Sequence, residues 1–195
     1  MKRLLLILIL TLSFQSWTKA DDISDFEIEG MSVGDSLLDY FSKEEILNGI
    51  VDWYDDLEKN RYVSMAFENS DFKTYEYVDV WTKHGDKNYL IDGIAGSIYF
   101  GNNKEFKDID DCYNKQKEIA NDMQGMFESA KKDGPYKLTH PSDPSGKSSY
   151  TDIYFILDNE YEATISCYDW SDDIIHKPDH FGIILRSKEL TMWLP

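Results

Sequence analysis

Basic residues are scarce in this sequence. It has 20 lysine and arginine residues against 37 aspartate and glutamate residues in 195, which gives a formal net charge of −17 at pH 7. A field of this sign repels nucleic acids and anionic lipid surfaces, so we expect neither as a partner. It favours cations and basic peptides, although an acidic surface that only keeps the protein in solution explains the same composition.

The sequence also lacks a hydrophobic run long enough to span a bilayer. The main apolar stretch, Leu4–Leu12, falls well short of the roughly 20 residues that a membrane helix needs. Two basic residues precede it and small residues follow it, which is the pattern of a cleavable secretory signal peptide. We predict a signal peptide over residues 1–20, with cleavage between Ala20 and Asp21.

No cysteine lies at the predicted cleavage site, where a lipid anchor would be attached. The first cysteine of the chain is Cys112. After cleavage the chain would comprise residues 21–195 and carry a formal charge of −20, because the signal peptide removes three basic residues and no acidic ones. We therefore expect a soluble protein with no stable membrane anchor, located in the periplasm or the external medium.

The chain contains two cysteines, Cys112 and Cys167. In an exported protein a pair of this kind favours a disulfide. Cys112 falls on the apolar face of a predicted helix and Cys167 in a predicted strand, so the bond would join a helix to a sheet. Two separately buried thiols are the alternative, and the spacing fits neither a redox motif nor a metal pair.

Hydrophobic periodicity predicts an α+β fold with a mostly antiparallel sheet of about six strands, covered by one or two helices. A capping box at Ser42–Glu45 opens a helix whose apolar stripe continues to Leu57, and the strongest helical pattern covers Asp108–Lys132. The connections between strands are too short for crossover helices, and the order of the predicted elements allows two strand triplets. We find no linker, and therefore predict a single domain over residues 21–195. The predicted strands are Tyr62–Phe67, Phe72–Trp81, Tyr89–Phe100, Tyr150–Leu157, Tyr161–Tyr168 and His180–Arg186, followed by a helical turn over Ser187–Leu194.

Four segments of the chain carry a resemblance to a known group. They read IEGMSVGDSLLDYFSKEEI, GKSSYTDIYF, ISCYDWS and, near the end, LTMWL. Together they resemble uncharacterised small exported proteins of marine alphaproteobacteria, over most of the chain that follows the signal peptide. The resemblance implies an exported α+β protein and carries no activity or functional residues with it.

One motif points to hydrolysis. Residues 34–37 read Gly-Asp-Ser-Leu, which resembles the nucleophile motif of the GDSL esterases and lipases, and residues 173–176 resemble the late Asp-x-x-His of that family. Ser36 would then be the nucleophile, His176 its base and Asp173 the supporting acid. Polar residues rather than an apolar strand precede Ser36, however, and alternating βα units are missing. A helix cap at Ser36 is therefore the favoured interpretation.

Two other patterns imitate binding motifs. Residues 145–148 read Ser-Gly-Lys-Ser, but the first glycine of a phosphate loop is missing and a strand follows, so we predict a turn. Carboxylates and a histidine crowd residues 169–179, where a calcium or zinc site is a weak candidate and a solvated acidic loop is favoured. The candidate ligands are Asp169, Asp172, Asp173 and His176.

Aromatic residues on the predicted strands offer a binding face. Tyrosines on strands usually pack at the rim of a sheet, but the same rings can line a ligand site. We expect a non-enzymatic binding or envelope-interaction protein of unknown ligand and without a cofactor, with a GDSL-type serine esterase as the alternative and a calcium-stabilised domain as a third possibility. The aromatic candidates are Tyr75, Tyr77, Trp81, Tyr154, Tyr161, Tyr168 and Trp170.

Overall fold

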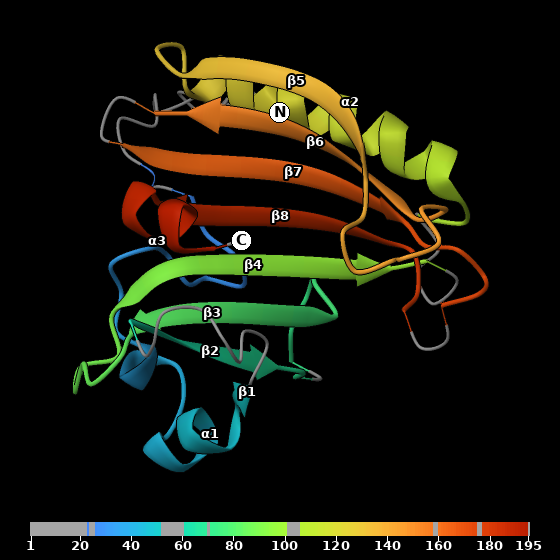
Figure 1. Cartoon of the computed structure of the whole chain (residues 1–195). Coiled ribbons are helices and arrows are strands. Elements are labelled where there is room, and N and C mark those ends of the chain that lie inside the picture. Colours follow the sequence, from blue (N-terminus) through green and yellow to red (C-terminus); the bar gives the residue numbers. More distant parts are fainter. Residues whose placement is uncertain are drawn as a thin grey trace, which may run out of the picture.

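The computed structural model describes residues 23, 26–51, 61–69, 71–100, 106–157, 160–174 and 177–194. Within these ranges, eight strands form one antiparallel sheet in the order β1-β2-β3-β4-β8-β7-β6-β5 (Figure 1). The strands are β1 (Ile50–Val51), β2 (Tyr62–Phe67), β3 (Tyr77–Lys83), β4 (Ile91–Tyr99), β5 (Lys131–Thr139), β6 (Ser149–Ile156), β7 (Tyr161–Asp169) and β8 (His180–Ser187).

The sheet consists of two meanders that meet at its centre. Strands β1 to β4 pair in sequence order, α2 (Ile109–Met126) then leads to the second half of the sheet, and β5 to β8 pair in sequence order. The last strand, β8, returns beside β4 and pairs with it from Gly93–Arg186 to Tyr99–His180. The central pair of strands therefore joins segments about ninety residues apart in the chain.

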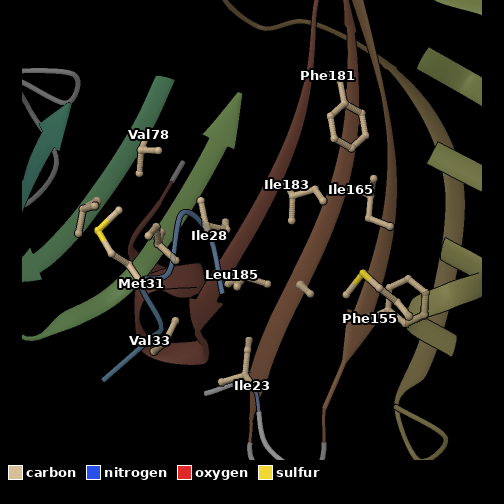
Figure 2. Packing of buried hydrophobic residues seen from close by; sticks show 14 of the residues in the cluster. Ile23, Ile28, Met31, Val33, Val78, Phe155, Ile165, Phe181, Ile183 and Leu185 are labelled. Carbon is tan, nitrogen blue, oxygen red and sulfur yellow. The ribbon is translucent and has the colours of Figure 1, made fainter. Parts of the chain in front are cut away.

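The two faces of the sheet have different covers, because side chains alternate along each strand. Phe181, Ile183 and Leu185 of β8 point to one face, where they are almost fully buried. Helix α2 covers this face over the second meander, and the segment before residue 34 covers it nearer the centre (Figures 1 and 2). Figure 2 shows Ile28 and Met31 of that segment packed among side chains of the sheet.

The opposite face carries only a short helix, α3 (Lys188–Trp193), at one end of the described sheet. Leu190 of α3 is fully buried against Tyr62, Trp81 and Ala95, which project from β2, β3 and β4. Gly93 makes this close approach possible, because a Cβ atom there would lie 2.2 Å from a methyl carbon of Leu190. No helix among the described residues is long and apolar enough to cross a membrane.

The predicted disulfide is present. Cys112 near the start of α2 is bonded to Cys167 of β7, with Cα atoms 6.0 Å apart and 55 positions between them in the sequence. One turn further along the helix, the buried Gln116 Nε2 donates to the carbonyl oxygens of Thr151 and Ile165, at 2.7 and 2.8 Å. The disulfide and these hydrogen bonds together fix α2 to the sheet.

The α+β class and the antiparallel pairing are confirmed, but the prediction of about six strands in two triplets is wrong. The structure adds β1 and β5, so each half of the sheet has four strands. The edge strand β5 has almost no buried side chain, and Gly134 and Pro135 lie at an irregularity in its pairing with β6. Edge strands tolerate proline and need no apolar alternation, so the pattern that identifies a buried strand is missing here.

Both predicted helices end earlier than their patterns suggest. The capping box is present, with Ser42 and Glu45 bonded to each other's backbone, but α1 ends at Asn48 and Ile50–Val51 form β1. The predicted helix Asp108–Lys132 begins as expected, with Asp108 as its N-cap, and ends at Met126. The final helical turn is confirmed as α3. The signal peptide and its cleavage site at Ala20 and Asp21 lie outside the described residues.

Candidate functional site

Four neighbouring strands each place one aromatic residue in the same register, on the face opposite α2. Tyr99 of β4 pairs with His180 of β8, His180 pairs with Tyr168 of β7, and Tyr168 pairs with Tyr150 of β6. Paired residues project to the same side of a sheet, so these four rings form a continuous line across the strands. All four are half-buried. We call them the ring row.

The rings of the row contact one another. Tyr168 and His180 lie nearly parallel, with centroids 4.3 Å apart and an angle of 15° between their planes. Tyr150 stacks on Tyr168 at 6.0 Å, and Tyr99 meets His180 at 5.5 Å with a plane angle of 64°. Aromatic pairs of this kind stabilise by roughly 0.5–1.5 kcal/mol beyond their buried area, so these contacts favour the observed arrangement of the rings.

Two loops extend the row at the same end of the sheet. The loop between β5 and β6 carries His140, whose ring centroid lies 4.1 Å from that of Trp170 in the loop between β7 and β8. His140 also contacts Tyr150 and Tyr168, at 5.6 and 6.0 Å. The rings of His140 and Trp170 therefore continue the ring row beyond the strands.

Polar contacts hold these two loops together. The Ser171 amide donates to Ser148 Oγ at 3.0 Å, and Lys147 forms an ion pair with Asp173 at 2.5 Å. Asp143 organises the first loop, because its carboxylate accepts hydrogen bonds from Ser148 and Ser145. These bonds hold the pKa of Asp143 well below its usual range. The predicted turn at residues 145–148 is confirmed as part of this loop.

Both histidines of the site are neutral at pH 7. Burial, together with the nearby His140 and Lys177, lowers the pKa of His180 to about 4, although a hydrogen bond with the Pro178 carbonyl opposes the shift. Burial and Lys177 also lower the pKa of His140. Burial raises the pKa values of Tyr99 and Tyr150. The rings therefore form an uncharged aromatic surface at neutral pH.

A polar strip of smaller side chains runs beside the ring row. Ser97, Gly182, Ser166 and Asp152 are paired in turn across β4, β8, β7 and β6. The Asp152 carboxylate accepts hydrogen bonds from Ser166 Oγ at 2.6 Å and from the Tyr154 hydroxyl at 2.7 Å. Burial raises the pKa of this carboxyl. Asp152 and Ser166 are almost fully buried, whereas Ser97 is half-buried, so a ligand on this face would meet the rings and, beside them, Ser97.

Known proteins add no further guidance to this site. Comparisons with protein families, curated proteins and solved structures found no match.

The structure places two members of the proposed esterase triad at opposite ends of the sheet. Ser36 pairs with Leu90, just before β4 begins, whereas Asp173 follows β7, whose last residues lie level with the end of β4. From Leu90 to Tyr99 the strand advances by nine residues, which is about 30 Å at 3.3 Å per residue. A working catalytic pair needs contact at about 3 Å. His176 lies outside the described residues.

Ser36 has a structural role where it stands. Its hydroxyl donates to the Asn88 carbonyl at 2.6 Å and accepts from the Leu38 amide at 3.2 Å. It thereby caps the 3-10 helix Leu37–Asp39, in which Leu37 is fully buried. The favoured interpretation of this motif as a helix cap agrees with these contacts.

The candidate metal ligands are not gathered into a site within the described residues. No group of three or more histidine, cysteine or acidic side chains there could hold a metal ion. Asp173 is paired with Lys147, and Asp169 lies 3.8 Å from Lys137. Asp172 is exposed, and His176 falls outside the described ranges.

The aromatic candidates from the sequence divide between the two faces. Tyr77, Tyr154 and Tyr168 lie on the face of the ring row, and Trp81 lies on the same face under α3, whereas Tyr75 packs against Gly96 on the opposite side. Tyr99, Tyr150, His140 and His180 were not among the aromatic candidates from the sequence. The alternation in β6, where Tyr150, Asp152 and Tyr154 oppose a buried apolar set, is the signal that could have found the face.

Proposed function

We propose that this protein is an exported, non-enzymatic binding protein whose binding surface is the ring row with its adjoining polar strip. The observation that carries the proposal is the alignment of four partly exposed rings in register across β4, β8, β7 and β6. Binding sites typically combine aromatic surface with a few fixed polar groups. The half-buried Ser97 supplies such a group next to the rings, and the buried Asp152 holds the Tyr154 hydroxyl in place by a hydrogen bond.

Export is supported by two independent features. The first is the signal-peptide pattern of residues 1–20. The second is the Cys112–Cys167 disulfide, because such bonds persist mainly in oxidising compartments such as the periplasm or the exterior. The envelope or the surrounding medium would then supply the ligand.

A panel of soluble ligands tests the proposal. Neutral oligosaccharides, alkylamines and short peptides would be screened for an increase in the melting temperature, which reports binding to the folded state. We expect at least one class to raise it in the wild type and in Tyr168→Phe, but not in Tyr168→Ala. Tyr113→Ala, a tyrosine on α2 at the other side of the sheet, is the matched control and should keep the response.

Three outcomes would overturn this proposal. One is a panel in which no compound changes the melting temperature. Another is binding that survives both Tyr168→Ala and Tyr150→Ala, which would place the ligand elsewhere. The third is labelling by a fluorophosphonate probe that disappears in Ser36→Ala, because this would identify a serine hydrolase.

A further inference from the structure

The protein places one of its own cations on an aromatic ring at the edge of the ring row. The Lys177 ammonium nitrogen lies 4.5 Å from the centroid of the Trp170 ring. This distance is well within the range of a cation–π interaction, and tryptophan is the strongest aromatic partner for a cation. The Lys177 side chain is exposed, so another cation can displace it without unfolding the loop.

The surroundings of Trp170 favour positive charge. Asp179 accepts a hydrogen bond from the Trp170 amide at 2.6 Å. Burial raises the pKa of Asp179, and the charges of Asp169 and Asp172 raise it further. Asp169 projects to the α2 face of the sheet, where it lies 3.8 Å from Lys137, so Asp172 and Asp179 supply the negative charge of the loop that carries Trp170. Because their pKa values are lowered, His140 and His180 are uncharged at pH 7 and do not oppose a cation. The formal charge of the chain is −17.

We propose that this end of the sheet binds a linear alkyl polyamine, and that Lys177 occupies the position of one ligand ammonium group on Trp170. The inference rests on the proposed function and names its ligand class. An aromatic ring together with the carboxyl groups of Asp172 and Asp179 in the same loop matches a ligand with more than one positive charge on an apolar chain, because one ammonium can lie on the ring and another can pair with a carboxylate while the methylene groups contact the rings.

Two other ligand classes fit the observations less well. A sugar ring requires an open, flat aromatic face, whereas Tyr168 and His180 lie nearly parallel at 4.3 Å and cover one another. A metal ion requires a cluster of ligating side chains, and the described residues contain no such group. An alkylammonium group requires one accessible ring and nearby negative charge, and both are present at Trp170.

Calorimetric titration of spermidine into the full-length protein tests the proposal. Lys177→Gln removes the internal competitor, so we expect it to bind spermidine about fivefold more tightly than the wild type. Lys117→Gln is the matched control, because it removes the same charge from an exposed position on α2, at the other side of the sheet. We expect this control to change the affinity less than twofold.

Substitution of the ring itself gives the second measurement. Trp170→Leu in the Lys177→Gln background should weaken spermidine binding about tenfold, whereas Trp170→Phe should retain most of it. Equal effects of Lys177→Gln and Lys117→Gln would refute the inference, because they would show only the general charge of the protein. Unchanged binding in Trp170→Leu would refute it as well.

A lack of spermidine binding in both the wild type and Lys177→Gln would also overturn the polyamine assignment. The proposed function would still stand in that case if another ligand class raised the melting temperature in a manner that depends on Tyr168. It would fail together with the polyamine assignment if every class in the panel failed.

Discussion

We expect a change from pH 7 to pH 5 to destabilise the folded protein through His180. Its surroundings hold the pKa at about 4, against an ordinary value of 6.5. Between these two values the unfolded chain binds a proton that the folded protein does not, so the stability falls as the pH falls through this window. The two pKa values correspond to a loss of about 2 kcal/mol between pH 7 and pH 5, and of about 3 kcal/mol once the pH is below 4.

Urea unfolding, followed by tryptophan fluorescence at both pH values, measures this loss. His180→Phe keeps a ring between Tyr99 and Tyr168 but cannot titrate, so its loss should be about 2 kcal/mol smaller than that of the wild type. Asp152 and Asp179, whose pKa values are raised, act in the opposite direction in both proteins and cancel in the comparison. His84→Phe, in an exposed turn, should behave like the wild type. Equal losses in the wild type and His180→Phe would refute the reasoning.

Three further predictions concern the packing of α2 and the cap at Ser36. Replacing Cys112 and Cys167 together by serine should lower the free energy of unfolding by about 4 kcal/mol, from the entropy of a 55-residue loop; an unchanged urea midpoint would contradict this. Gln116→Leu should lower the free energy of unfolding by about 2 kcal/mol, because two buried strand carbonyls lose a donor. Gln116→Glu keeps the shape of the side chain without the amide donor, and so tests whether the shape alone matters. Ser36→Ala should cost about 1 kcal/mol in urea unfolding and leave hydrolysis of p-nitrophenyl acetate at the background rate; a fall in hydrolysis would restore the esterase alternative.

The sequence predicted those elements best that lie inside the sheet. Tyr62–Phe67 has the predicted bounds, and β7 and β8 differ from their predictions by a single residue at one end. Each of these strands buries the side chains of one face, so the alternation of apolar and polar residues in the sequence identifies the strand. The edge strand β5 buries neither side. Ile50 and Val51 fit a helical stripe as well as a strand. The local pattern cannot show that α1 ends at Asn48, with Gly49 as a C-cap whose amide donates to the Glu45 carbonyl.

The candidate site was only partly predictable for a related reason. Strand tyrosines were identified, but the sequence does not say which of them share a face until the register between strands is known. Tyr99 and His180 are far apart in the chain and meet because β8 pairs with β4. The Ser36 motif suggested residues that would have to meet but do not. A match of four residues carries no information about the distance between Ser36 and Asp173.

The position of β8 between β4 and β7 has a consequence for the order in which the protein can form. A nascent chain that has reached only the end of β7 holds two incomplete half-sheets, each with an unpaired edge that can bind another strand. Contacts such as Gly93 with Arg186 close only after nearly the whole chain has emerged, and contacts of such long sequence separation form slowly. Folding is therefore expected to finish only after synthesis, when β8 can pair with both β4 and β7.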